Sequence, residues 1–185
     1  MTLLEIFLIA VGLSMDAFAV SICKGLAVKS VKPKHAVCVG IYFGGFQLLM
    51  PLLGYLLGTG LSAIISSVAP WVAFILLAFI GGNMIREAVS GEEEEANDSF
   101  SVKTMLPLAV ATSIDALATG VAFAAMEVRI LPALILIGCT TFVISAVGLY
   151  IGYFFGSRYQ KKAEIFGGLV LIGIGLKILL ERLFT

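Results

Sequence analysis

The chain has 185 residues, of which 60% are hydrophobic and 13% are charged, and its mean hydropathy is +1.09. Soluble domains have about 45–50% apolar and about 25% charged residues, so this composition excludes a water-soluble globular protein. The 12 Lys and Arg balance the 12 Asp and Glu, which argues against a basic nucleic-acid-binding protein and an acidic disordered chain. We therefore expect an integral membrane protein.

Six apolar stretches are long enough to cross a membrane as helices, because about 20 residues span a hydrocarbon core of roughly 30 Å. They lack the alternation of barrel strands, so the predicted fold class is all-α with six transmembrane helices. The first stretch has no preceding Lys or Arg and contains Glu5 and Asp16, which favours a retained span over a cleaved signal peptide. The six predicted spans are residues 3–23, 36–58, 70–89, 105–126, 130–155 and 163–183.

The positive charges predict the orientation of these spans, since cytoplasmic loops retain Lys and Arg. Loops one, three and five, with their flanks, hold most of the cations, so we expect them in the cytoplasm and both termini outside. Loop three also contains the acidic run 92–95 with Asn97 and Asp98, which we interpret as a hydrated linker. The cytoplasmic set is Lys24, Lys29, Lys32, Lys34, Arg86, Lys103, Arg158, Lys161 and Lys162; the outer set is Arg129, Lys177 and Arg182.

An internal repeat divides the chain into two halves. The motif SMDAFA at residues 14–19 recurs as SIDALA at residues 113–118, an offset of 99. At an offset of 98, Gly40, Gly54 and Gly58 correspond to Gly138, Gly152 and Gly156. Three spans per half invert the second half relative to the first. The sequence thus predicts inverted three-helix repeats at residues 1–89 and 105–185, joined by a cytoplasmic linker at 90–104, a construction typical of secondary transporters.

Two aspartates, Asp16 and Asp115, lie within about 5 Å of the centres of the first and fourth spans at 1.5 Å rise per residue. A carboxylate at this depth costs on the order of 3 kcal/mol, which favours a functional role. We expect the surrounding faces to pack closely against other helices, so that the carboxylates meet between the halves. Small neighbours one turn away support this: Gly12, Ala19, Ala111 and Ala118.

Facing carboxylates in a dry site need two positive charges, which a divalent cation or two protons supply. The candidate metal ligands are Asp16, Asp115, Gln47, Ser14, Thr112 and Ser113, with further hydroxyls nearby at Thr140, Thr141 and Ser145. Carboxylate, amide and hydroxyl oxygens suit Mn²⁺, Mg²⁺ or Ca²⁺, whereas thiolates and imidazoles suit Zn²⁺ and Cu⁺. We expect the only histidine, His35, in a solvated loop, and no cofactor.

Other small residues predict packing. The three cysteines, Cys23, Cys38 and Cys139, lack metal-binding spacing and are expected as core residues without a disulfide. Glycines four residues apart favour close helix contacts within one chain over dimerisation. These glycine series are Gly40/Gly44, Gly54/Gly58 and Gly148/Gly152/Gly156.

These motifs resemble those of the bacterial manganese efflux pump family, within the LysE-like superfamily of exporters. The resemblance rests on residues 14–17 (SMDA), 43–47 (FGGFQ), 50–52 (MPL), 112–116 (TSIDA) and 167–173 (GGLVLIG), and it covers essentially the whole chain. It implies a multi-pass protein of the bacterial inner membrane that exports Mn²⁺ from the cytoplasm. It also implies that Asp16 and Asp115 occupy the positions of the family's transmembrane acidic residues.

The resulting hypothesis is Mn²⁺/H⁺ antiport, because returning two bare carboxylates through the membrane is costly and protons neutralise them. No GxxxxGKS or GxxxxGKT loop is present to bind ATP. The alternatives are an exporter of another divalent cation or of an amino acid, and an intramembrane aspartyl protease. The whole-chain repeat favours transport, so we expect no enzymatic activity. The expected partners are Mn²⁺, H⁺ and the lipid bilayer, with no nucleic acid; the sequence does not indicate an oligomer.

Overall fold

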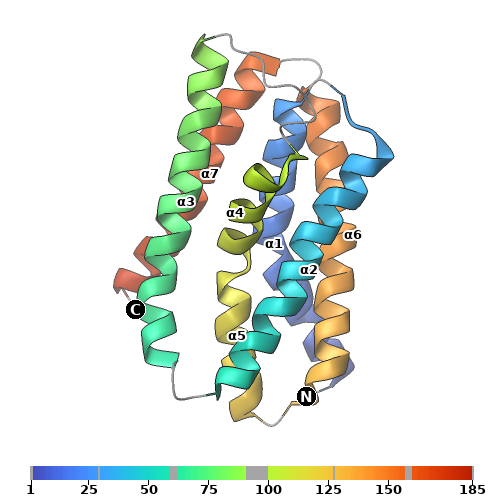
Figure 1. Ribbon diagram of the computed structural model, residues 1–185, viewed down its shortest axis with the longest axis vertical. Helices are drawn as coiled ribbons and strands as arrows, with labels where there is room; N and C mark the ends of the chain where they lie inside the picture. The colour runs from blue at the N-terminus through green and yellow to red at the C-terminus, as the bar shows by residue number, and fades with distance from the viewer. Residues whose placement is uncertain are drawn as a thin grey trace.

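The computed structural model describes residues 2–28, 30–58, 62–90, 100–126, 128–156 and 160–184. The acidic run 92–95, with Asn97 and Asp98, lies outside these residues. The regular elements in the described ranges are seven α-helices that form an elongated bundle (Figure 1). They are α1 (Leu3–Ala27), α2 (Pro33–Leu57), α3 (Ser62–Ser90), α4 (Val102–Thr112), α5 (Ile114–Ala125), α6 (Ile130–Gly156) and α7 (Gln160–Phe184).

Local sequence signals fix where the first helices begin. Thr2 and Glu5 form a reciprocal capping box at the start of α1: the Thr2 N–H donates to Glu5 Oε2 at 2.8 Å, and the Glu5 N–H donates to Thr2 Oγ1 at 3.3 Å. Pro33 occupies the first turn of α2, where its missing N–H removes no helical hydrogen bond.

Several of the helices are long and apolar enough to cross a membrane, as expected of a multi-pass membrane protein. By length and composition, α1, α2 and α6 each suffice to span a membrane, among the described residues. Helices α4 and α5 are long and apolar enough only together, as a bent pair that forms either a broken span or a re-entrant loop. Shorter apolar segments lie in α3, over Pro70–Asn83, and in α7, over Ile165–Lys177. Large apolar side chains project outward, as at Leu56, Leu131 and Phe154, which are 72%, 70% and 75% exposed. Such an outer surface suits lipid.

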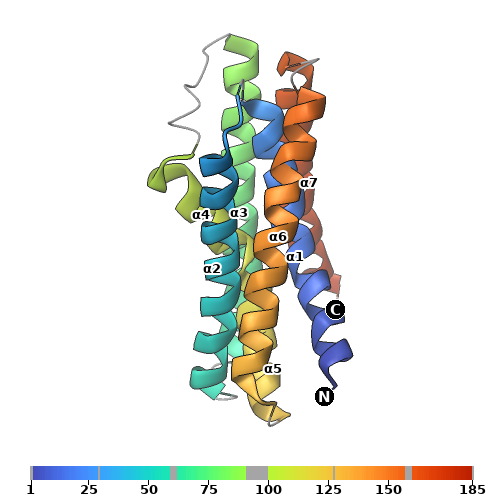
Figure 2. The ribbon, with the colours of Figure 1, turned by 90° about the vertical axis from the view of Figure 1, so that its right-hand side faces the viewer.

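The helices pack as pairs that are far apart in the sequence. Helix α1 packs mainly against α6, α2 packs against both α5 and α6, and α3 pairs with α7 (Figures 1 and 2). The C-terminal end of α1 and the N-terminal ends of α2 and α4 lie at one end of the bundle, whereas both chain termini lie toward the other (Figure 1).

The prediction of one continuous helix over residues 105–126 is wrong. The chain bends by 43° between α4 and α5 at Ser113, whose φ and ψ are −110° and 7°. Two consecutive hydroxyl side chains bond back to the preceding turn: Thr112 Oγ1 donates to the Leu108 carbonyl at 3.0 Å, and Ser113 Oγ to the Ala109 carbonyl at 2.7 Å. Such bonds compete with the helical ladder and bend helices.

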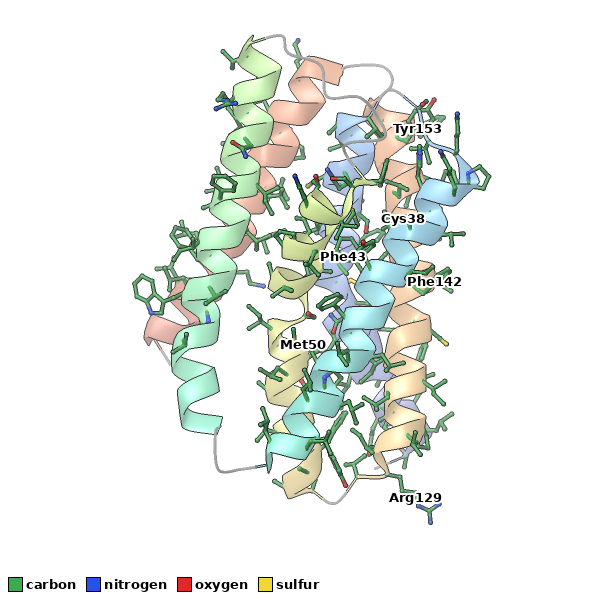
Figure 3. All side chains as sticks on the ribbon, viewed as in Figure 1. Cys38, Phe43, Met50, Arg129, Phe142 and Tyr153 are labelled. Carbon is green, nitrogen blue, oxygen red and sulfur yellow. The ribbon has the colours of Figure 1, made fainter. Side chains whose placement is uncertain are left out.

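Glycines bring the helix backbones together, as the four-residue spacings predicted. A Cβ on Gly44 would lie 2.8 Å from the Gly138 carbonyl oxygen, and one on Gly40 would meet the ring of Phe142 at 2.6 Å (Figure 3). Glycines of the other two series also contact neighbouring helices: Gly54, Gly148 and Gly152. The prediction of packing within one chain is therefore confirmed at these positions.

The expected place of His35 is wrong, and that of the cysteines is partly so. His35 lies in the first turn of α2, is only 4% exposed, and stacks on the ring of Phe100 with centroids 4.4 Å apart. Its Nδ1 accepts a hydrogen bond from the Lys32 N–H, so the imidazole closes the helix end and does not face solvent. The cysteines are all free, but Cys23 alone is buried; Cys139 is exposed.

Candidate mid-membrane polar site

The two aspartates occupy unlike local structures. Asp16 lies within the continuous helix α1, and its side chain is half-buried. Asp115 lies in the first turn of α5, and its side chain is exposed in the protein taken without lipid. The N-terminal end of a helix carries partial positive charge and stabilises a carboxylate by about 0.3–1 kcal/mol at exposed positions. The break at Ser113 thus creates a helix end beneath one of the two carboxylates.

The close packing expected around both aspartates is only partly present. No neighbouring heavy atom lies within 4 Å of where a Cβ on Gly12 would be, and Ala118 is exposed, so that prediction is wrong at these two positions. Ala111 is buried and Ala19 is half-buried. Each aspartate therefore has closely packed neighbours on one side only.

Gln47 ties together the turns that precede the two aspartates. Its side chain is fully buried, and its Nε2 donates to the Leu13 carbonyl at 2.7 Å and to the Thr112 carbonyl at 3.1 Å. Each of these carbonyls lies three residues before an aspartate, and their positions differ by 99, the offset of the aspartate motif. One amide thus braces α1 against the end of α4 at the level of the candidate site.

The remaining predicted ligands are buried hydroxyls that already donate to their own helices. Ser14 Oγ donates to the Val11 carbonyl at 2.8 Å, and Thr112 and Ser113 make the bonds that accompany the bend. All three are at most 1% exposed. Because each hydroxyl hydrogen already takes part in a hydrogen bond, only the oxygen lone pairs are available to coordinate a cation.

Among the described residues, three buried side-chain oxygens have no hydrogen-bond partner: Gln47 Oε1 on α2, and Thr141 Oγ1 and Ser145 Oγ on α6. Leaving such a group unsatisfied costs about 1–3 kcal/mol, so these atoms mark a place where something polar belongs. Thr140, beside Thr141, is only half-buried. From the sequence, Thr141 and Ser145 are two of several hydroxyls near the candidate ligands, and nothing there favours them over the others. The one available signal is the repeat: Ser145 follows Gln47 by 98 residues, the offset that relates the glycines of the two halves.

The donor set restricts how a metal ion is held. Within the described residues, no three side chains of His, Cys, Asp or Glu gather in a group suited to a metal ion. A cation at this depth must therefore complete its coordination with neutral oxygens, from amide, hydroxyl, backbone or water.

A helical bundle that exposes apolar side chains and keeps carboxyl, amide and hydroxyl groups at mid-depth is a multi-pass membrane protein built to handle a polar solute. A family model described as "Putative manganese efflux pump" matches residues 30–179. The chain belongs to this family of manganese efflux pumps, which makes it a transporter and not an enzyme.

Curated relatives extend the match to nearly the whole chain. The "Putative manganese efflux pump MntP" of Acetivibrio thermocellus is 55% identical over 99% of this chain and 93% of its own length. The proteins of the same name from Desulfitobacterium hafniense and Methanosarcina mazei are 54% and 49% identical, over 97% and 99% of this chain and 95% and 98% of their own lengths. No solved structure matches the chain.

Proposed function

We propose that this chain exports Mn²⁺ from the cytoplasm as a proton-coupled secondary antiporter, with Asp16 and Asp115 as the charged ligands of the ion. Membership of the manganese efflux pump family supports the substrate and the direction. The observation that carries the site is the buried Gln47 amide, which bonds the carbonyls three residues before each aspartate. It gives the two carboxylates a common polar layer inside an apolar bundle.

Equivalent contacts support an inverted repeat of residues 1–89 and 105–185 joined by residues 90–104. Gly54 of α2 approaches Val121 of α5, and Gly152 of α6 approaches Ile22 of α1. The offset of 98 relates Gly54 to Gly152, and the offset of 99 relates Ile22 to Val121. The seam between α2 and α5 therefore has its counterpart between α6 and α1, as a two-fold axis in the membrane plane requires.

The broken span suits an ion-binding role. Helix ends within a membrane bring partial charges to the midplane: N–H groups at the start of one half-helix and carbonyls at the end of the other. Here Thr112 is the last residue of α4, and Asp115 lies in the first turn of α5. A cation beside these groups meets one carboxylate and carbonyl oxygens, and Asp16 supplies the second negative charge.

Proton coupling follows from the cost of the empty site. With Mn²⁺ bound, two carboxylates and one divalent ion are neutral together; without the ion, two negative charges remain at mid-membrane depth, which is costly. Protonation removes both charges on the return step. The exchange of one Mn²⁺ for two protons then moves the two halves without a net buried charge.

The charge pattern supports an orientation in the bacterial inner membrane with both termini outside. Lys24 lies in the last turn of α1, and Lys32, Lys34 and Lys103 lie at the N-terminal ends of α2 and α4, which share one end of the bundle (Figure 1). Arg129 lies at the other end (Figure 3). Cytoplasmic loops retain the larger number of cations. Mn²⁺ then enters from the end that carries the N-termini of α2 and α4.

The test is Mn²⁺ transport by purified protein in liposomes that contain a Mn²⁺-quenched dye. We expect an acidic lumen to accelerate Mn²⁺ entry, and Asp16→Asn and Asp115→Asn to reduce entry to the level of protein-free liposomes. Glu5→Gln removes an exposed carboxylate from the same helix as Asp16 and is expected to transport normally. Full transport by either Asn variant contradicts the ligand assignment, and indifference to the pH gradient contradicts the coupling.

A further inference from the structure

The residue just before α4 is held by the first two turns of α2. The imidazole of His35 stacks on the ring of Phe100, with the ring planes 16° apart. One turn farther along α2, the Cys38 Sγ donates to the Phe100 carbonyl at 3.8 Å (Figure 3). Phe100 is 9% exposed and directly precedes Ser101, the N-cap residue of α4. The contacts of His35 and Cys38 with Phe100, which we call the aromatic latch, fix the start of α4 against α2.

Helix α4 connects the aromatic latch to the candidate site. It ends at Thr112, whose carbonyl accepts a hydrogen bond from Gln47 of α2. Helix α2 therefore holds α4 near both ends, through Phe100 at the start and through Thr112 at the bend. Phe100 also shares one core cluster with Met105 and Leu108 of α4. A movement of Phe100 out of this cluster therefore loosens the first turns of α4.

The latch requires a neutral imidazole. A backbone N–H can only donate, so His35 Nδ1, which lies 3.3 Å from the Lys32 nitrogen, accepts this bond through its lone pair. The hydrogen of the neutral ring is therefore on Nε2, which is buried and has no acceptor within the described residues. A protonated imidazole has no lone pair, so it loses the bond to Lys32 and places a charge on a side chain that is only 4% exposed.

The surroundings of His35, which precedes the second predicted span, oppose its protonation. Burial, followed by the charges of Lys34 and Lys32, lowers the pKa of the imidazole from its usual value of 6.5. The N-terminal end of α2 adds partial positive charge. No acid offsets these charges in the described residues 20–28, 30–40, 100–105 and 146–156. The other titratable groups in these ranges are cations, thiols and a phenol or two per helix: Cys23 and Lys24 of α1, Cys38 of α2, Lys103 of α4, and Tyr150 and Tyr153 of α6.

Acid therefore favours the open latch. Because the pKa of His35 is lower in the closed latch than in a solvated imidazole, closure is fully favoured above about pH 6.5. It is progressively lost as the pH falls from there through the lower pKa of the closed latch. The unsatisfied hydrogen on Nε2 weakens the closed state further, because the open state exposes this group to water.

We propose that protonation of His35 releases Phe100 from α2 and loosens the start of α4, so that acidification of the cytoplasm slows export. A loosened α4 no longer holds the Thr112 carbonyl and Asp115 in place beside α1 and α2. The opening of the latch requires no manganese, but its effect on export rests on the proposed function. Antiport brings protons into the cytoplasm, and the latch then lowers the rate as they accumulate.

The single histidine makes the latch directly observable. Purified full-length chain with ¹⁵N-labelled histidine and no histidine tag gives the signals of one imidazole by NMR in detergent. We expect the Nε2–H tautomer at about pH 7.5 and a titration midpoint below 6.5. The amides of Thr104 and Met105, which bond the Ser101 carbonyl, report the start of α4. Their hydrogen exchange, corrected for the intrinsic rate, should accelerate about tenfold between pH 7.5 and 5.5, the effect of one pKa unit.

His35→Phe keeps an aromatic ring against Phe100 but cannot be protonated, so its corrected exchange rate should not change with pH. In the liposomes described above, lowering the outer and inner pH together keeps the gradient constant. Transport by the wild type should then fall at least about threefold more than transport by His35→Phe. Lys34→Gln removes a charge that opposes protonation and should raise the NMR midpoint. Lys162→Gln removes an exposed charge from α7 and should leave it unchanged.

A midpoint at or above 6.5 overturns the latch, as does equal acceleration of exchange in His35→Phe and the wild type. Equal loss of transport in these two proteins overturns the control of export. If the wild type transports no Mn²⁺ at any pH, the proposed function and the control of export both fail, whereas the exchange rates still decide whether acid opens the latch.

Discussion

At the scale of single residues, the hydrogen-bond partners of Gln47 separate the roles of its amide nitrogen and its amide oxygen. The sequence predicts it as a metal ligand because it carries an oxygen at mid-depth. In the structure its nitrogen braces two backbone carbonyls, and only its oxygen remains for an ion. Sequence reasoning could not divide these roles, because the Leu13 and Thr112 carbonyls come from other helices and meet Gln47 only after folding.

This double role predicts an unusual order of stability for variants of Gln47. Asparagine withdraws the amide by about 1.5 Å, one carbon–carbon bond, so both hydrogen bonds break while the amide stays buried. Methionine loses the same bonds but buries no amide. We expect Gln47→Asn to lose about 2 kcal/mol or more of stability, Gln47→Met to lose less, and the melting temperature in detergent to fall by about 4–8 °C for Asn. Equal melting temperatures for Gln47→Asn and the wild type would contradict the brace.

At the scale of helices, apolar length predicted most of the elements, but not the break in the fourth span. The first and fourth spans carry similar motifs, yet α1 continues through Ser14, whereas the chain bends at Ser113. One difference accounts for the bend: Leu13 precedes Ser14, whereas Thr112 precedes Ser113, so that two consecutive hydroxyls bond back to the preceding turn. A hydropathy pattern misses this because Thr and Ser keep the span apolar enough to cross the membrane.

Close glycine contacts predict a sharp contrast between two Gly→Ala variants. A Cβ on Gly152 would clash with the Ile22 carbonyl oxygen, whereas one on Gly45 would meet no atom within 4 Å. Overpacking costs about 1–3 kcal/mol, and Gly in a helix is about 0.5–1 kcal/mol less stable than Ala. We expect Gly152→Ala to lower the melting temperature by several degrees and Gly45→Ala to leave it unchanged or raise it. A stable Gly152→Ala protein would show that α1 and α6 are farther apart.

At the scale of the whole molecule, the aspartate motifs and the glycine offsets predict two inverted three-helix repeats, which stay a prediction. The contacts of Gly54 with α5 and of Gly152 with α1 fit that expectation. No sequence pattern predicts the distance between Asp16 and Asp115 or the exposure of Asp115, because the orientation of two helices about their axes depends on all of their neighbours. Burial of Gln47, Thr141 and Ser145 is likewise a result of packing from several helices at once.

The same architecture makes the orientation in the membrane testable with two exposed positions at opposite ends of the bundle. Lys34 lies in the first turn of α2, and Arg129 lies just before α6 (Figure 3). In a chain whose three native cysteines are replaced by alanine, Arg129→Cys should react with a membrane-impermeant thiol reagent in intact cells. Lys34→Cys should react only after the membrane is opened, because cation-rich loops stay in the cytoplasm. The reverse labelling would invert the proposed topology, so that Mn²⁺ would enter the protein from the periplasmic side and the proposed exchange with protons would import the ion.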